Sequence, residues 1–162
     1  LAQIFNFCWS DSLKFHSQMI DGIIANHRVI MIKPSTFMNL SGSAIQSVCA
    51  YYKIETQNII IMHDDIDLPS GSVKFKLGGN AGGHNGLKSV DQFVGRDYYR
   101  VRMGVGRPEN SQHSVSDFVL AALNSNEYNW LLDLAKIISN NLDLFFFDKH
   151  TEFKNQLCQR PA

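Results

Sequence analysis

The chain has 162 residues, of which 44% are hydrophobic and 19% are charged, and its formal net charge is zero. This length and composition predict one globular domain with a substantial core and exclude disordered, collagen-like and disulfide-stabilised classes. The three cysteines are odd in number and widely spaced, so we expect reduced thiols and a cytoplasmic location. The apolar runs are too short to cross a bilayer.

Basic residues gather in the middle of the chain. Between Lys74 and Arg107 there are seven lysines and arginines but only two acidic residues, so this segment carries a charge of +5 and the rest carries −5. A basic middle between acidic ends can attract a polyanion to one face of a protein. A basic surface that is only solvated remains an alternative.

The first part of the chain predicts a short helix and then a β-hairpin. Leu1–Asp11 has apolar residues at helical spacing. Ser17–Ile24 and Arg28–Lys33 are rich in Ile, Val and Met, and the residues Ala25–His27 between them favour a turn. We therefore expect two antiparallel strands here.

A helix and a buried strand are predicted next. Ser41 is a suitable N-cap, and apolar residues at helical spacing follow it to about Lys53. Asn58–Met62 contains an unbroken run of apolar residues after its first position, which is typical of a strand buried on both faces. The polar cluster His63–Asp67 follows directly, and ligand sites in α/β sheets lie at the carboxyl ends of strands.

The second half of the chain alternates further strands and helices. Val73–Leu77 and Tyr99–Val105 alternate apolar and basic residues, as half-buried strands do, and Asn85–Val94 fits a helix. Three more helices are predicted near Ser116–Ala122, Asn126–Ser139 and Asn140–Leu157. Strands interleaved with helices predict a single three-layer α/β domain, with a sheet flanked by helices.

Asn39 stands just before the helix that is predicted to begin at Ser41. An asparagine at such a position is often only a turn or capping residue. Alternatively, its carboxamide projects into a pocket and binds a carbonyl group or a water molecule, where a donor can stabilise developing negative charge. The sequence leaves both interpretations open.

The cluster His63–Asp67 carries three carboxylates within four residues. A divalent metal site is disfavoured, because no repeat of oxygen ligands follows and Pro69 interrupts the segment. Asp64 is better suited to orient a histidine base and to stabilise its protonated form. Asp67 is expected to close the turn before Pro69.

The segment Gly78–Leu87 contains five glycines and is expected to form a loop whose backbone approaches a ligand closely. It lacks the Gly-Lys-Ser/Thr ending of a P-loop and the spacing of a dinucleotide site. His84 and Asn85 can hydrogen-bond a polar substrate there. Lys76 and Arg102 could clamp a terminal phosphate, or they could line a solvated strand face.

These segments together resemble the bacterial peptidyl-tRNA hydrolase family. The resembling blocks occur in the family's order and spacing: Lys33–Gly42 (KPSTFMNLSG), His63–Gly71 (HDDIDLPSG), Lys74–Gly79 (KFKLGG), Gly82–Leu87 (GGHNGL) and Tyr99–Pro108 (YRVRMGVGRP).

The resemblance implies an enzyme that cleaves the ester between a peptide and the 3′-terminal ribose of tRNA, and so recycles tRNA from abortive translation. It implies a single α/β domain over residues 1–162, with a twisted mixed sheet between helices. It also implies a monomer that binds the acceptor stem and CCA end of peptidyl-tRNA, with no metal, no cofactor and no membrane.

The resemblance assigns roles as well. Asn39 and Asn85 would contact the peptidyl-adenosine end and the attacking water, and Asp64 would keep the catalytic histidine basic. The remaining residues would bind substrate: Phe37 and Met38 along the peptide channel, and Lys76 and Arg102 at the 5′-phosphate of tRNA.

One part of the family pattern has no counterpart in this sequence. The family opens with a strand, an Asn-Pro-Gly turn and an Arg-His-Asn segment that supplies the catalytic histidine, and neither His16 nor His27 matches that position. We expect Leu1 to correspond to the helix after that histidine, in an incompletely recorded active enzyme. A shortened homologue that binds RNA without hydrolysing it is the alternative.

Overall fold

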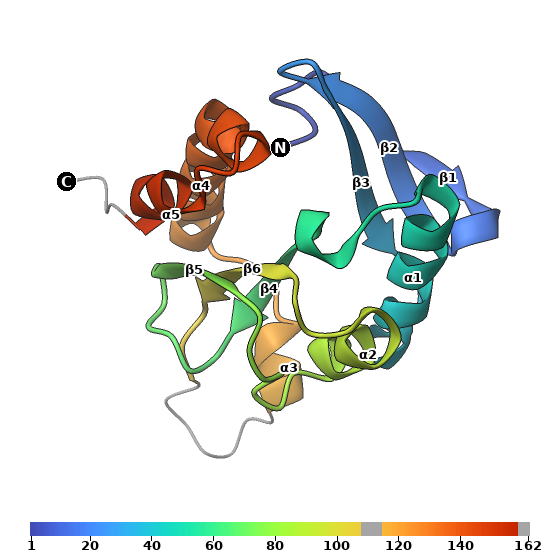
Figure 1. Ribbon diagram of the computed structural model, residues 1–162. Coiled ribbons are helices and arrows are strands. Elements are labelled where there is room, and N and C mark those ends of the chain that lie inside the picture. Colours follow the sequence, from blue (N-terminus) through green and yellow to red (C-terminus); the bar gives the residue numbers. More distant parts are fainter. Residues whose placement is uncertain (108–114, 159–162) are drawn as a thin grey trace. The chain divides into compact units, whose positions relative to one another are not determined.

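The computed structural model describes residues 1–107 and 115–158, which divide into two compact units (Figure 1). The first, which we call the hairpin unit, contains residues 2–60 and 77–99. The second, which we call the carboxyl-terminal unit, contains Leu1, residues 61–76 and the described residues from 100 onward. Pro108, at the end of one family-like block, lies outside the described residues.

An antiparallel sheet in the order β1-β2-β3 forms one layer of the hairpin unit. Strands β2 (Ser17–Ile24) and β3 (His27–Pro34) confirm the predicted hairpin. Ala25 and Asn26 have φ values of 47° and 64°, and two consecutive left-handed residues twist a hairpin turn in the sense that its strands require.

The helix predicted over Leu1–Asp11 is wrong. Residues 2–6 form a turn, and β1 (Ser10–Ser12) pairs with β2 in the register Ser10↔Met19. Asn6 has a φ of 55°, which a right-handed helix cannot continue through. Pairing with the exposed edge of β2 therefore overrides the helical spacing of the apolar residues.

Helix α1 (Ser41–Tyr52) covers one face of this sheet (Figure 1). Val48 of the helix packs in one cluster with Phe15 and Met19, flanked by Ile30 and Ile32 of β3. The apolar residues whose spacing predicted this helix thus lie on the face that the helix buries.

Ser41 does not cap α1 as predicted. A 3₁₀ helix, η2 (Met38–Leu40), runs directly into α1, so Leu40 occupies the N-cap and Ser41 is the first helical residue. The Ser41 hydroxyl instead donates to the Met38 carbonyl oxygen at 2.9 Å. The turn that carries Asn39 is therefore continuous with a rigid helix.

The second sheet has the order β4-β6-β5, with β4 (Ile60–Asp65), β5 (Val73–Leu77) and β6 (Tyr99–Gly104). Backbone bonds from Tyr99 to Ile59 and from Val105 to Asp65 make β4 and β6 parallel. Bonds from Gly104 to Ser72 and from Gly78 to Tyr98 make β6 and β5 antiparallel. The sheet is therefore mixed.

Strand β4 differs from its prediction in position and burial. It begins two residues later than predicted and includes His63–Asp65, which were expected to follow it. Met62 is 39% exposed, so the strand is not buried on both faces. The apolar run marked the element correctly, but backbone pairing with β6 sets its end at Asp65.

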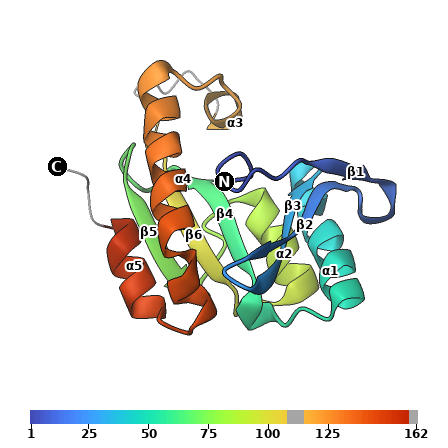
Figure 2. The same ribbon diagram turned by 90° about the horizontal axis from the view of Figure 1, so that it is seen from above.

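Helices α4 (Ser125–Phe146) and α5 (His150–Cys158) pack beside β5 and β6 (Figure 2). The Phe75 ring of β5 lies 5.0 Å from the Phe153 ring and 6.4 Å from the Phe145 ring, between centroids. These edge-to-face contacts join both helices to the sheet.

The predicted boundary between helices at Ser139 and Asn140 is wrong, because α4 runs through it. Leu134, Ile138 and Leu142 are all buried and form one continuous stripe across that point. The chain turns instead at Asp148, whose φ is 58°. The short helix α3 (Val115–Val119) corresponds to the one predicted over Ser116–Ala122.

Candidate functional site

Five of the residues predicted to act on substrate lie in the hairpin unit, on η2, on the residue before it and at the start of α2 (Asn85–Val94). They are Phe37, Met38, Asn39, His84 and Asn85. The helix predicted over Asn85–Val94 is confirmed with the same bounds. Two of the sequence blocks that carried the resemblance thus meet within one unit.

Two glycines allow these elements to lie in contact. A Cβ atom at Gly86 would stand 2.6 Å from the Met38 Sδ atom and 2.9 Å from the His84 Cε1 atom, so the glycine leaves room for both side chains at the first turn of α2. A Cβ atom at Gly42 would stand 2.1 Å from the Ser89 carbonyl oxygen. The Gly42 N–H donates to the Ser89 hydroxyl at 3.0 Å, which fixes α1 against α2.

His84 is the N-cap of α2 rather than a freely projecting ligand. Its Nδ1 atom accepts the Leu87 N–H at 3.2 Å, and a ring nitrogen that accepts carries no proton. The predicted substrate contact of His84 is therefore limited to the rest of its ring.

Asn85 is the first residue of α2 and is exposed. Its Oδ1 atom accepts from the Lys88 Nζ atom at 3.3 Å, which orients the amide nitrogen as the outward donor. The amino end of a helix also carries a positive potential that favours negative charge. Asn39 is exposed as well.

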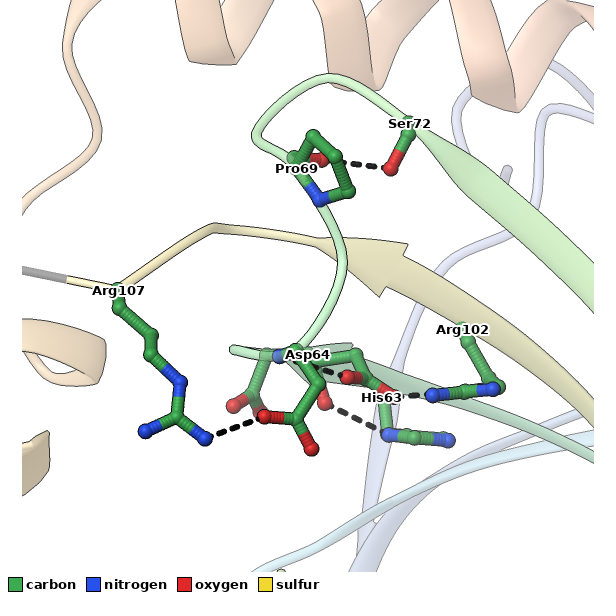
Figure 3. Close-up of polar contacts among 8 residues, drawn as sticks. His63, Asp64, Pro69, Ser72, Arg102 and Arg107 are labelled. Carbon is green, nitrogen blue, oxygen red and sulfur yellow. Dashed lines mark hydrogen bonds and ion pairs between the residues drawn. The ribbon is translucent and has the colours of Figure 1, made fainter. Parts of the chain in front are cut away.

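Strands β4 and β6 of the carboxyl-terminal unit hold a second polar group (Figure 3). The Arg102 Nε–H donates to Asp65 Oδ2 at 2.6 Å, and Arg107 Nη2 donates to Asp67 Oδ1 at 2.5 Å. The Asp67 backbone N–H donates to Asp65 Oδ1, which supports the prediction that Asp67 closes the turn. The cluster is a network of ion pairs.

His63 is 8% exposed, and its Nδ1 atom lies 2.7 Å from the Asp64 carbonyl oxygen. Because a carbonyl oxygen only accepts, Nδ1 carries the proton in this bond. Successive side chains of a strand point to opposite faces, so Asp64 lies on the face opposite Asp65 and outside the Arg102 pair. Asp64 is half-buried.

The charges around Arg102 shift two pKa values. Burial acts to raise the pKa of Asp65, but the bond from Arg102, the Asp67 N–H and nearby positive charge outweigh it, so the pKa lies below its usual range. Burial lowers the pKa of Lys76, and the charges of Arg102 and Arg100 lower it further. The Asp65 charge acts in the opposite direction but does not outweigh these effects on the pKa of Lys76.

The structure places the predicted residues in two groups. Asn39, Asn85 and the residues beside them belong to the hairpin unit, while Asp64, Lys76 and Arg102 belong to the carboxyl-terminal unit. Sequence reasoning missed the Asp65–Arg102 pair. Opposite charges near the ends of two predicted strands were the available signal, but it needed the knowledge that β4 and β6 are neighbours.

Two searches of the described residues concern other classes of site. No group of three or more His, Cys, Asp or Glu side chains among them is arranged to hold a metal ion. None of the helices within that part of the chain is both long and apolar enough to span a membrane.

Solved structures of peptidyl-tRNA hydrolases share this fold. The chain superposes on a crystal structure of peptidyl-tRNA hydrolase from Acinetobacter baumannii with a TM-score of 0.90 and 30% identity, over 99% of this chain and 82% of that one. A peptidyl-tRNA hydrolase in complex with N-propanol gives the same values. These matches confirm the predicted α/β fold class.

The sequence comparisons identify the family. The chain is 44% identical to the peptidyl-tRNA hydrolase of Rickettsia canadensis and 45% identical to that of Rickettsia felis, in each case over 97% of this chain and 84% of the relative. The peptidyl-tRNA hydrolase family profile matches residues 1–161. The chain belongs to the peptidyl-tRNA hydrolase family, as predicted; that residues 1–162 form one domain stays a prediction.

Proposed function

We propose that this chain hydrolyses the ester bond between peptide and tRNA in peptidyl-tRNA. The observation that carries the proposal is the family match over residues 1–161, which includes the blocks around Asn39, Asp64 and Asn85. The hairpin unit supports it physically, because two exposed carboxamides stand on adjacent elements at the amino end of a helix.

The proposed reaction is the attack of water on the ester carbonyl carbon. The carbonyl oxygen becomes an oxyanion, and the Asn39 and Asn85 amide N–H groups donate to it or orient the water. The bond to the ribose oxygen then breaks, and this oxygen takes up the proton that was removed from water, which gives the tRNA 3′-hydroxyl. The peptide carboxylic acid releases its own proton to solvent and becomes a carboxylate. We assign Asp64 to orient the histidine that removes the proton from water and to stabilise its protonated form.

Lys76 and Arg102 are proposed to bind the 5′-phosphate of tRNA. Arg102 holds Asp65 through Nε, and its terminal nitrogens are the groups that would hold a phosphate. Phe37 and Met38 are proposed to line the path of the peptide. We further propose that the protein acts as a cytoplasmic monomer.

The experiment is a single assay with two readouts, made on the protein as its gene encodes it. Labelled N-acetylated aminoacyl-tRNA is incubated with the protein, and both its retention and the release of the label are measured. Asn39→Ala and Asn85→Ala should each reduce release about 100-fold. Ser47→Ala, on the exposed surface of α1, is the control and should leave release unchanged.

Each alternative outcome has a clear meaning. Retention without release would overturn hydrolysis in favour of an RNA-binding role. If the protein neither retained the labelled tRNA nor released the label, the proposed substrate would be overturned as well. Equal activity of the asparagine variants and the control would show that the carboxamides take no part.

A further inference from the structure

Met38 is the most exposed of the five methionines, all of which the structure describes. It is 55% exposed, compared with 39% for Met62 and 6% for Met19, and the other two are partly buried. A small molecule in solvent can therefore reach its side chain. Met38 directly precedes Asn39 on η2, so a chemical change there occurs beside the carboxamide that we assign to the ester.

The Met38 sulfur lies where three elements meet. Its own residue belongs to η2, and the sulfur lies 3.9 Å from the Oγ atom of Ser41, the first residue of α1. A Cβ atom at Gly86 would stand only 2.6 Å from the sulfur, so the thioether also packs against the first turn of α2. A chemical change at this sulfur therefore acts on the contacts of η2 with both helices.

The Ser41 hydroxyl has two acceptors within reach, and both belong to Met38. It donates to the Met38 carbonyl oxygen at 2.9 Å, and the Met38 sulfur at 3.9 Å is the weaker alternative, because a thioether is a weak acceptor. The bond to the carbonyl oxygen joins η2 to the start of α1. A stronger acceptor at the position of the sulfur would compete for this hydroxyl and weaken the connection.

Oxidation of the thioether creates such an acceptor. The sulfur attacks one oxygen of a peroxide with its lone pair, a sulfur–oxygen bond forms and the oxygen–oxygen bond breaks. With hydrogen peroxide the second oxygen leaves as water, so the sulfur is oxidised and the peroxide is reduced. The resulting sulfoxide is polar and chiral, and methionine sulfoxide reductases return it to the thioether.

We propose that Met38 is a site of reversible oxidation by peroxides, and that the sulfoxide lowers activity because it displaces Asn39. The sulfoxide oxygen takes the Ser41 hydroxyl from the Met38 carbonyl oxygen, and the larger group disturbs the close packing of the sulfur against Gly86. The turn η2 then shifts relative to α1, and Asn39 shifts with it. The loss of activity rests on the proposed function, whereas the oxidation and the displacement do not.

The first measurement locates the added oxygen in the protein as its gene encodes it. The protein is treated with hydrogen peroxide and then with dithiothreitol, which reverses disulfide and sulfenic acid formation at cysteine but leaves the sulfoxide. Peptides are analysed by mass spectrometry over time. Met38 should gain oxygen before Met62, and Met19 should gain it last, in the order of their exposure. Slower oxidation of Met38 than of Met62 would overturn the proposed site.

The second measurement follows the Asn39 carboxamide without use of activity. Its side-chain amide signals in nitrogen-edited NMR spectra are identified by their loss in Asn39→Ala. They should move when the unmodified protein is oxidised and should stay in place in Met38→Leu, which keeps the size of the side chain but has no sulfur. Met62→Leu is the matched control and should respond like the unmodified protein. Unmoved signals in the oxidised unmodified protein would overturn the displacement.

The third measurement is release of the label from N-acetylated aminoacyl-tRNA, with each protein compared with its own untreated activity. Oxidation should reduce release about tenfold in the unmodified protein and in Met62→Leu but not in Met38→Leu. Methionine sulfoxide reductases A and B together should restore it, because each reduces one epimer of the sulfoxide. The melting temperature should stay almost unchanged, since the Met38 side chain is exposed.

The possible failures are distinct. If untreated protein released no label, the proposed function would be overturned, and mass spectrometry and NMR would still decide whether Met38 is oxidised and Asn39 displaced. An equal loss of release in Met38→Leu and in the unmodified protein would place the sensitive group elsewhere and overturn the proposal. A loss that came with a large fall in melting temperature would show unfolding and would overturn it as well.

Discussion

Asp65 and Arg102 form a close ion pair between the neighbouring parallel strands β4 and β6. Their Oδ2 and Nε atoms lie 2.6 Å apart, and the side chains are only 12% and 23% exposed. A pair at this depth is more than a surface contact, because removal of either partner leaves a largely buried charge. Arg102, expected from the sequence to bind phosphate, thus has a structural role as well.

Arg102→Ala should lower the free energy of unfolding by about 2 kcal/mol, because it leaves the Asp65 carboxylate without its cation. The double variant with Asp65→Ala should recover much of this loss, as no unpaired charge remains. Chemical denaturation of the two single variants and the double variant measures the coupling. Additive losses, within about 0.5 kcal/mol, would contradict a paired role.

The same pair makes stability depend on pH in the acid range. The pKa of Asp65 is lower in the folded state than its ordinary value of 3.8. The folded state therefore binds fewer protons than the unfolded state, and the pair stabilises the fold above pH 4 or so. This contribution is lost as the pH falls through the folded-state pKa. Melting temperatures from pH 6 to pH 2 should fall less steeply for Asp65→Asn; parallel curves would contradict the assignment.

Lys76 presents a conflict between stability and binding. Burial and the charges of Arg102 and Arg100 lower its pKa, so the folded state disfavours the charged ammonium group. Lys76→Met should therefore not lower the melting temperature, yet it should weaken tRNA binding and reduce the slope of log affinity against log salt by about 1. Lys136→Met, on α4 and paired with Asp133, is the control. An unchanged salt slope would exclude a phosphate contact at Lys76.

Asp64 should affect turnover rather than binding. Asp64→Ala removes the carboxylate that we assign to the histidine base, so kcat should fall about 100-fold while tRNA affinity stays nearly constant. Asp67→Ala is the matched control, because Asp67 is exposed and pairs with Arg107 instead. Equal losses of kcat and affinity at Asp64 would indicate a role in RNA binding.

The hairpin and α2 were predictable from the sequence because their signals are local. The bounds of β2 and α2 follow from apolar spacing and from turn residues that lie within a few positions. The errors arise where contacts between residues far apart in the sequence determine the local secondary structure. Pairing with β2 makes residues 10–12 a strand, and a continuous buried stripe carries α4 through Asn140.

In the candidate site, too, local motifs predict some features, and contacts between distant residues determine others. The sequence motifs predicted roles for Asn39 and Asn85, and the structure adds that η2 and α2 bring the two residues into one unit. Spacing alone could not reveal that Arg102 is already paired with Asp65, because the two residues are 37 positions apart.

Gly42 and Gly86 should respond differently to the same substitution. A Cβ atom at Gly42 would meet the Ser89 backbone, which cannot move without separating α1 from α2, so Gly42→Ala should cost about 3 kcal/mol. At Gly86 the obstacles are side chains, the flexible end of Met38 and the edge of the His84 ring, and alanine also favours the helix. Gly86→Ala should therefore leave the melting temperature almost unchanged.

Activity should nevertheless fall in Gly86→Ala, because displacement of Met38 disturbs η2 and with it the carboxamide of Asn39. Thermal unfolding and peptide release, measured on the same two variants, separate the effects. If Gly86→Ala kept full activity, the contact between η2 and α2 would not matter for Asn39. If instead it unfolded as readily as Gly42→Ala, the Met38 side chain would be fixed by packing and the proposed flexibility would be wrong.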